Sequence, residues 1–189
     1  MRVTPELRQR TEAALRGEAG SLDRLVEAWL PVVLSWCTRL GGPRVDAEEA
    51  AHDVLMVVAR RLDAVYDADR FPAWLFGVTR RTLGRHRRRA FMARWVPGLE
   101  IDARDPSSGP ARLYAVSEQT RRVQELLERI SEEDREVLVL ALLEDRPDTE
   151  VAEILDIPVG TMKSRLRRAR ERFLRLARAT DLHPMEEER

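Results

Sequence analysis

The sequence predicts an all-α protein, in which two small helical domains are joined by a flexible linker. Apolar residues recur every three or four positions along most of the 189 residues, as in amphipathic helices, and no useful stretch alternates as a strand does. The chain is rich in Ala, Leu, Arg and Glu, which favour helices. A run of Pro, Gly and Ser near the middle of the chain interrupts the periodicity and indicates a domain boundary.

The N-terminal domain is predicted to span residues 1–95. A first helix covers residues 5–16 and ends at a glycine, and a second begins at Ser21 and reaches about residue 40. We expect Ser21 to be the N-cap of this second helix. Pro31 should kink or divide it, because proline removes a backbone donor.

Two further helices complete this domain. Asp46 is the expected N-cap of a helix that runs to about Val65. Residues 66–70 form a polar connector, and the next helix runs from about residue 71 to about residue 95.

Residues 96–115 are the predicted linker, residues 116–180 the second domain, and residues 181–189 a disordered tail. A helix is expected over 116–130, and Ser131 should open the next one. The core face of that helix is predicted to consist of Val137, Leu138, Ala141 and Leu142.

The strongest functional pattern is two helices around a tight turn near the C-terminus. The first helix is predicted at residues 149–156, the turn at 157–160, and the second helix from Thr161 onward. In the second helix the predicted buried face is Met162, Leu166, Ala169 and Phe173, at steps of four, three and four. The side chains that then point outward are Lys163, Ser164, Arg167 and Arg168. This pattern predicts a helix-turn-helix that binds duplex DNA, and a solvated basic helix face is the alternative interpretation.

Arginines crowd the helix predicted at residues 71–95, at positions 80, 81, 85, 87, 88 and 89, and Arg94 follows. They wrap most of its circumference, which costs stability unless an anion neutralises them. Nucleic-acid phosphate is the natural partner, ahead of a membrane surface or simple solubility. Tyr66, Phe71 and Trp74 precede the basic run and suit stacking on unpaired bases, although core packing is a strong alternative for all three and the favoured interpretation for Trp74.

No pattern in the sequence predicts catalysis, a metal or a cofactor. His52, His86 and His183 lack metal-ligand spacing, and neither a phosphate-binding glycine loop nor an activated nucleophile occurs. The single cysteine, Cys37, excludes a disulfide within the chain and is either a small buried hydrophobe or a redox sensor. No signal peptide core and no apolar run of membrane-spanning length are visible, so we expect a soluble, cytoplasmic protein without stable membrane insertion.

The order of these motifs resembles the extracytoplasmic-function sigma factors of the bacterial sigma-70 family, over roughly residues 22–178. Residues 157–170 are similar to the region-four helix that reads the minus-thirty-five element. Residues 70–75 and the basic helix resemble the part of region two that melts and reads the minus-ten element. Residues 46–54 resemble the segment that docks on the polymerase clamp.

The resemblance implies a protein that joins core RNA polymerase, directs promoter recognition and transcription initiation, and has no catalytic activity of its own. It implies minus-thirty-five contacts by Thr161, Lys163, Ser164, Arg167 and Arg168. It implies minus-ten contacts by Arg70, Trp74, Arg80, Arg81, Arg85 and Arg88. It implies core polymerase binding by Glu48, Glu49 and Asp53. An anti-sigma factor of unknown identity is a further implied partner.

Two other functions remain open on the sequence alone. A conventional helix-turn-helix regulator, with an N-terminal dimerisation or sensing domain, would bind its operator without polymerase. The arginine run at residues 80–94 argues against it, because a sensing domain has no need of that charge. An RNA-modifying or nucleotide-using enzyme would instead bind a nucleotide or a metal as the pure protein.

Overall fold

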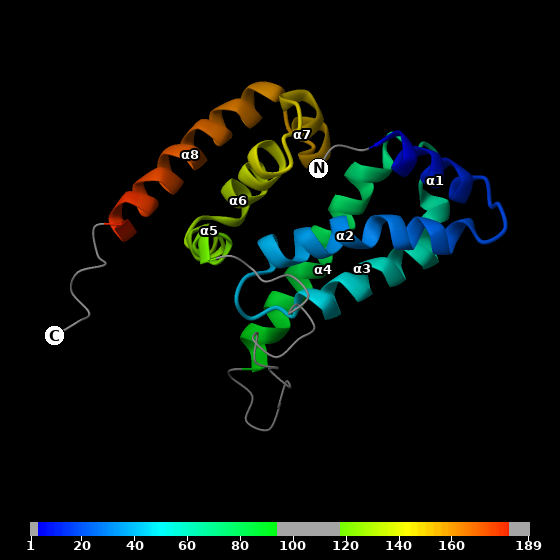
Figure 1. The fold of residues 1–189 in the computed structure, drawn as a ribbon, viewed down its shortest axis with the longest axis horizontal. Coiled ribbons are helices and arrows are strands. Elements are labelled where there is room, and N and C mark those ends of the chain that lie inside the picture. The colour runs from blue at the N-terminus through cyan, green and yellow to red at the C-terminus, as the bar shows by residue number, and fades with distance from the viewer. Residues whose placement is uncertain (1–3, 94–117, 182–189) are drawn as a thin grey trace. The chain divides into compact units, whose positions relative to one another are not determined.

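The computed structural model describes residues 4–93 and 118–181 (Figure 1). Within these two ranges every regular element is a helix and no strand occurs, which confirms the all-helical class. The chain divides into two compact units, one before and one after the gap. The predicted domain bounds stay predictions. The expected linker at 96–115 and the expected tail, apart from Asp181, lie outside the described residues.

Four α-helices make up the described part of the N-terminal unit, residues 4–93, and α2 contacts each of the other three. They are α1 (Pro5–Leu15), α2 (Ser21–Gly41), α3 (Ala47–Arg61) and α4 (Phe71–Ala93), with a short 3-10 turn, η1 (Leu62–Ala64), after α3. Two edge-to-face ring pairs join α2 to α4 in the core: Trp29 with Phe71, at a centroid distance of 5.2 Å, and Trp36 with Phe76, at 5.0 Å. All four rings are buried, so the start of α4 is fixed by apolar packing.

Asp46 is the N-cap of α3, as predicted, and its carboxylate accepts hydrogen bonds from the backbone N–H groups of Glu48 and Glu49, both at 2.9 Å. The predictions for α2 need two corrections. Gly20, at a φ of 67°, occupies the N-cap position, so Ser21 is the first residue of the helix. The helix also runs undivided through Pro31, which lies on its exposed side while Trp29 and Val33 pack into the core.

The C-terminal unit contains α5 (Glu118–Glu128), α6 (Glu132–Leu138), η3 (Val139–Leu143), α7 (Asp148–Leu155) and α8 (Val159–Asp181). Ser131 caps α6, as predicted, and its hydroxyl accepts a hydrogen bond from the Asp134 backbone N–H at 3.3 Å. In Figure 1, α8 is the long helix that runs from orange to red. It contacts both α6 and α7.

The core face predicted for residues 137–142 is only half right. Val137 and Leu138 are buried, whereas Ala141 is half-buried and Leu142 is 45% exposed. The reason is a π turn at the end of α6, in which the Glu144 N–H donates to the Val139 carbonyl at 3.0 Å. The wider turn rotates the following residues relative to a regular helix, so Val139 and Leu140 enter the core instead.

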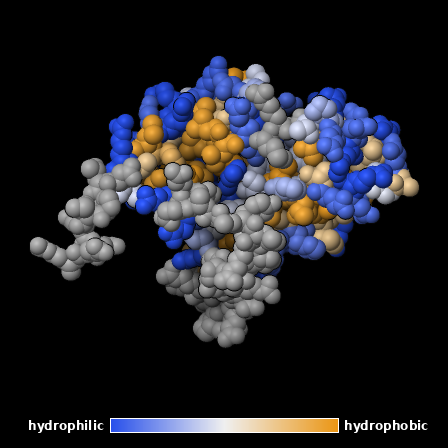
Figure 2. Space-filling model, viewed as in Figure 1, coloured by the Kyte–Doolittle hydropathy of each residue, from blue (hydrophilic) through white to orange (hydrophobic). Residues whose placement is uncertain are grey.

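Cys37 is buried, and burial raises the pKa of its thiol to about 12. A thiol that stays protonated at neutral pH is a poor redox sensor, so the structure favours the small buried hydrophobe. Figure 2 shows hydrophilic residues over most of the coloured surface, with hydrophobic patches between them. None of the helices in the described ranges has the length and hydropathy to cross a membrane.

Candidate nucleic-acid interface

The helix-turn-helix is formed by α7, α8 and the short turn between them. Asp156 ends α7 in the left-handed conformation, at a φ of 53°, and its N–H donates to the Glu153 carbonyl at 3.1 Å. The Met162 N–H donates to the Pro158 carbonyl at 2.9 Å, which closes the first turn of α8. The second helix therefore begins at Val159, two residues before its predicted start. Proline in this position supports the start of a helix because it needs no backbone donor.

One side of α8 packs into the unit, and the other carries the predicted DNA-binding residues. Met162 and Ala169 have no exposed surface, whereas Leu166 and Phe173 are half-buried. The predicted buried face is thus confirmed in direction, although its last residue lies at the margin of the core. The residues predicted to contact the minus-thirty-five element are all exposed: Thr161, Lys163, Ser164, Arg167 and Arg168.

Three of these five side chains have protein partners in this structure. The Lys163 ammonium lies 3.7 Å from the Asp148 carboxylate of α7, and the Arg167 guanidinium lies 3.0 Å from the Glu171 carboxylate one turn later. The Ser164 hydroxyl donates to the Thr161 carbonyl at 2.9 Å. The two ion pairs are exposed and therefore weak, so phosphate or a base edge can replace the carboxylates.

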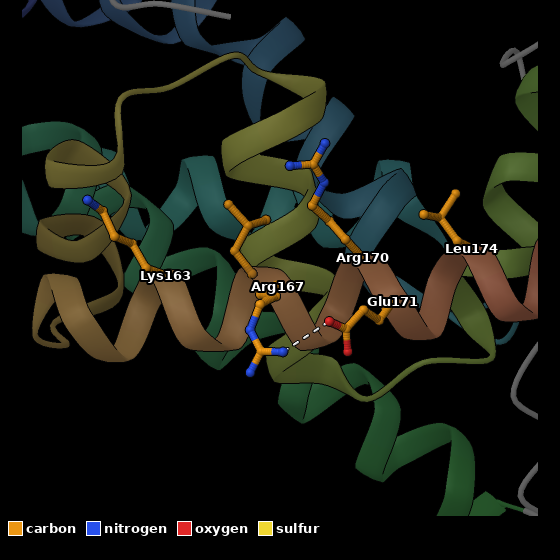
Figure 3. Close-up of a pocket in the computed structure, with 6 residues that line it drawn as sticks. Lys163, Arg167, Arg170, Glu171 and Leu174 are labelled. Atoms are coloured by element: carbon orange, nitrogen blue, oxygen red, sulfur yellow. Dashed lines mark hydrogen bonds and ion pairs between the residues drawn. The ribbon is translucent and has the colours of Figure 1, made fainter.

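A shallow hollow of about 310 Å³ runs along α8 (Figure 3). Its lining comes from this one helix: Lys163, Leu166, Arg167, Arg170, Glu171 and Leu174. The close-up shows the Arg167–Glu171 ion pair on one side of the helix and Arg170 projecting on the other. A hollow lined by one helix surface is no enclosed active-site cavity. Among the described residues, no group of three or more His, Cys, Asp or Glu could hold a metal ion.

Two arginines on α8 hold the helix against the acidic first turn of α6. The Arg165 guanidinium lies 3.3 Å from the Glu133 carboxylate, and the Arg172 guanidinium lies 2.9 Å from the Asp134 carboxylate. Arg165 and Arg172 are seven residues apart, so they leave α8 on the same side. Both acids belong to the acidic first turn of α6, so the same carboxylates that suit the helix N-terminus also place α8.

The basic residues of α4 divide between two directions. The Arg87 guanidinium donates to the Leu40 carbonyl at 2.9 Å, and the His86 Nε2 lies 3.0 Å from the Asp53 carboxylate. Arg89 pairs with Glu49 of α3 at 3.5 Å. The arginines therefore extend from the exposed side of α4 to the sides that meet α2 and α3. These three side chains hold α4 against α2 and α3, and the sequence carried no signal of the His86–Asp53 pair.

The remaining arginines of α4 are exposed, as Arg89 is, and they are the four that were predicted to contact DNA: Arg80, Arg81, Arg85 and Arg88. Two of them reach back over glycines one turn earlier. A guanidinium nitrogen of Arg81 lies 3.4 Å from where a Cβ would stand at Gly77, and one of Arg88 lies 3.9 Å from that point at Gly84. Trp74 is half-buried one turn before this face, with its ring 5.7 Å from the Phe71 ring.

The connector, residues 66–70, links the end of α3 to α4 without regular structure. Tyr66 is 94% exposed, the largest value among the large apolar residues of the described ranges. Phe71, in contrast, is fully buried, so the sequence hypothesis that it stacks on bases is wrong. Arg70 is exposed at the end of the connector, and its N–H donates to the Asp67 carbonyl at 3.1 Å.

The residues predicted to bind core polymerase lie on α3. Glu48 is exposed in the first turn, whereas Glu49 and Asp53 face α4 and pair with Arg89 and His86. The acidic side of α3 therefore also anchors the basic helix. Of these three acids, Glu48 is exposed and has no described partner on α4.

Comparison with known families matches both halves of the chain. A family model described as Sigma-70 region 2 matches residues 25–91, and one described as Sigma-70, region 4 matches residues 120–173. The chain is 24% identical over 180 residues to the ECF RNA polymerase sigma factor SigW of Bacillus subtilis, which covers 87% of this chain and 93% of SigW. It is 28% identical over 161 residues to the ECF RNA polymerase sigma factor RpoE of Cereibacter sphaeroides, over 79% of this chain and 82% of that protein.

Two solved structures are also similar. CnrH, solved in complex with the cytosolic domain of CnrY, aligns with a TM-score of 0.64 at 25% identity, over 91% of this chain and 97% of CnrH. The sigma factor RpoE from Bartonella quintana, solved with the anti-sigma factor NepR, also aligns with a TM-score of 0.64, over 82% of this chain and 96% of that one. Its identity of 24% makes this second likeness one of fold alone.

Proposed function

We propose that three surfaces of this chain carry out promoter recognition. The chain belongs to the extracytoplasmic-function group of the sigma-70 family, whose members direct RNA polymerase to promoters. The exposed side of α8 reads the minus-thirty-five element as duplex. The arginine face of α4 and the connector engage the melted minus-ten element. The first turns of α3 dock on core polymerase, which performs the chemistry.

The observation that supports this proposal best is the direction of α8. Burial of Met162 and Ala169 orients the helix, and the five side chains implied by the family resemblance then lie on its open side. A helix that presents Lys, Ser and Arg from its N-terminal turns suits the major groove, where arginine can fork onto guanine and lysine can bind phosphate. The burial of one side of α8 and the family resemblance thus point to the same open side of the helix.

The minus-ten surface combines charge with an aromatic side chain. Four exposed arginines of α4 supply phosphate contacts. Tyr66 presents a nearly free ring from the connector, and an exposed ring suits stacking on an unpaired base. Trp74 has part of its ring in contact with Phe71, so we assign it a smaller share of base contact.

The proposed partners are core RNA polymerase and promoter DNA, and the proposed location is the cytoplasm, where polymerase acts. An anti-sigma factor is proposed as a third partner because two similar proteins were solved with CnrY and with NepR, the latter named as an anti-sigma factor.

Run-off transcription with core polymerase tests the function and the arginine face together. Replacing both Arg80 and Arg81 by Ala is expected to reduce open-complex formation by about tenfold or more, because two phosphate contacts are lost near the melted strand. Core binding should stay unchanged. Permanganate reactivity of unpaired thymines measures melting, and co-elution measures core binding.

The matched control for this experiment is the double replacement of Arg60 and Arg61 by Ala, which removes the same charge from the exposed end of α3. Melting that persists at wild-type strength in the Arg80 and Arg81 variant would refute the assignment of this face. Promoter binding without polymerase, together with no run-off product, would instead support the conventional regulator.

The docking surface is tested by charge reversal at Glu48. Glu48→Lys is expected to weaken binding to core polymerase severalfold, since its carboxylate is exposed on the proposed docking turn. Reversal of Glu49 or Asp53 should also weaken core binding, but it breaks contacts to α4 at the same time. Glu27→Lys, an exposed position on α2, is the control. Equal co-elution of the Glu48 variant and the control with core enzyme would rule out this surface.

A further inference from the structure

An ion pair joins α1 to the connector. The Arg8 guanidinium donates to both carboxylate oxygens of Asp69, at 2.9 and 3.0 Å, and its Nε also binds Glu12 at 2.9 Å. The two partners lie 61 positions apart in the sequence. A fork of this kind fixes orientation as well as distance, because both oxygens are held.

A second, buried path leads from α1 to the same segment. The Trp29 indole N–H donates to the Thr11 hydroxyl at 3.2 Å, and the Trp29 ring packs edge-to-face on Phe71. Thr11 lies one turn after Leu7 on the buried face of α1. The exposed side of α1 therefore contacts Asp69 directly, and its buried side is linked to Phe71 through Trp29.

Between these two attachments the chain forms a tight turn. The Asp69 N–H donates to the Asp67 carboxylate at 2.9 Å, and the Phe71 N–H donates to the Ala68 carbonyl at 3.3 Å. Tyr66 stands just outside this turn with its ring exposed. Its position thus depends on how firmly residues 67–71 are held.

We propose that α1 is a brace for the connector, and that Arg8 and Asp69 are positioning residues for the capture of an unpaired base by Tyr66. This inference rests on the proposed function of the connector. The helix lies outside the stretch of the chain that matches the region 2 family model, which begins at residue 25. In this proposal Arg8 and Asp69 position the connector and do not themselves contact DNA.

The charge of Asp69 makes the brace testable. A carboxylate beside a nucleic-acid site repels phosphate, so simple electrostatics predicts that its removal strengthens DNA binding. The brace predicts the opposite, because loss of the fork lets the connector move and raises the entropic cost of base capture. Both side chains of the pair are more than half exposed, so the effect is limited to about two- to fivefold.

The experiment uses holoenzyme assembled from core polymerase and the full-length chain. Binding is measured to a single-stranded oligonucleotide that carries the non-template minus-ten sequence, and to a scrambled oligonucleotide. Asp69→Asn and Arg8→Ala should each lower the preference for the minus-ten sequence about two- to fivefold. The double variant should be no worse than either single variant, because both changes remove the same fork. Core co-elution and helicity should not change.

Two controls separate the possible outcomes. Arg10→Ala removes an arginine whose ion pair, among the described residues, is with Glu6 of the same helix, and it should leave the preference intact. Tyr66→Ala tests the proposed function itself and should abolish most of the preference. A loss with Tyr66→Ala but none with Asp69→Asn refutes the brace and leaves the connector's function standing. Equal preference in the Tyr66 variant and wild type refutes the connector's function, and stronger binding by Asp69→Asn refutes the brace.

Discussion

Arg146→Met is expected to destabilise the C-terminal unit by about 3–5 kcal/mol, because it removes the cation from a buried ion pair. The Arg146 side chain is 1% exposed, and its Nε donates to the Glu144 carboxylate, itself 3% exposed, at 2.7 Å. The guanidinium also binds Glu150 in the first turns of α7. One side chain thus ties the end of η3 to the helix-turn-helix.

The large expected effect comes from desolvation. A carboxylate taken out of water needs a cation or several donors to compensate, and the Arg146 guanidinium supplies that cation to the buried Glu144 carboxylate. The exposed Arg167–Glu171 pair should contribute only about 0.3–0.5 kcal/mol, because water already solvates both groups. Loss of about 3–5 kcal/mol is a large fraction of the 5–15 kcal/mol that typically holds a protein folded.

Urea denaturation followed by circular dichroism measures this prediction, with Arg167→Ala as the exposed control. The double variant Glu144→Met with Arg146→Met should regain much of the loss, because the nearly fully buried carboxylate is then gone and only the partly exposed Glu150 lacks this partner. Run-off transcription with the single variant should lose its dependence on the upstream element, while core binding through the N-terminal unit persists. Equal stability of the Arg146 variant and the control would show that the buried pair contributes little.

The helices were predictable where local patterns decide them. Asp46 and Ser131 were expected as caps, and both accept backbone hydrogen bonds as cap residues do. Periodicity also gave the direction of α8, since Met162 and Ala169 mark its buried side. These features depend on residues within a few positions of one another, so a sequence is enough to find them.

The failures arise where tertiary contacts or a rare turn overrule the local pattern. The π turn at Val139 carries no strong sequence signal. Because of it, Leu140 is buried in the core where the periodicity predicted Leu142. Packing of Trp29 and Val33 keeps α2 continuous past Pro31. Pro31 alone predicted a break there, because helix propensity does not include the packing energy of the surrounding core.

The candidate site shows the same division. That α4 is basic could be read from composition, and the family resemblance indicated four arginines that are exposed. The contacts of Arg87 and Arg89 could not be predicted, since they depend on where α2 and α3 lie. His86 and Asp53 are 33 positions apart, and only the fold brings them within 3.0 Å. Long-range pairs such as Arg8 with Asp69 lack any sequence period and thus escaped prediction.

The recognition helix offers the sharpest test of DNA reading. If Arg168 forks onto a guanine, Arg168→Ala should cost about 1–3 kcal/mol and relax the preference at one base pair. Arg167 is the other candidate for base contact, but it must first leave Glu171. Arg168 is exposed and has no partner among the described residues, so it is free to reach a base without that exchange.

Loss of the Lys163 side chain should affect DNA binding in a different way from loss of either arginine. Its ammonium lies beside Asp148 of α7 at the start of the helix, where a phosphate would replace the carboxylate. Lys163→Ala should therefore weaken all promoter sequences alike and reduce the slope of log affinity against log salt by about one. The two kinds of contact can thus be distinguished: loss of a base contact lowers affinity in a sequence-dependent way, and loss of a phosphate contact changes the salt dependence of affinity.

Holoenzymes that carry Arg167→Ala, Arg168→Ala or Lys163→Ala are titrated against promoter variants at several salt concentrations. Arg178→Ala is the control, because it removes the same charge from the exposed last turn of α8, about 15 Å beyond Arg168. The expected result is lost base preference for one of the two arginine variants and a uniform, salt-dependent loss for Lys163→Ala. If all three variants match the control in affinity and preference, the open side of α8 is only a solvated basic face, and the upstream element must be read elsewhere.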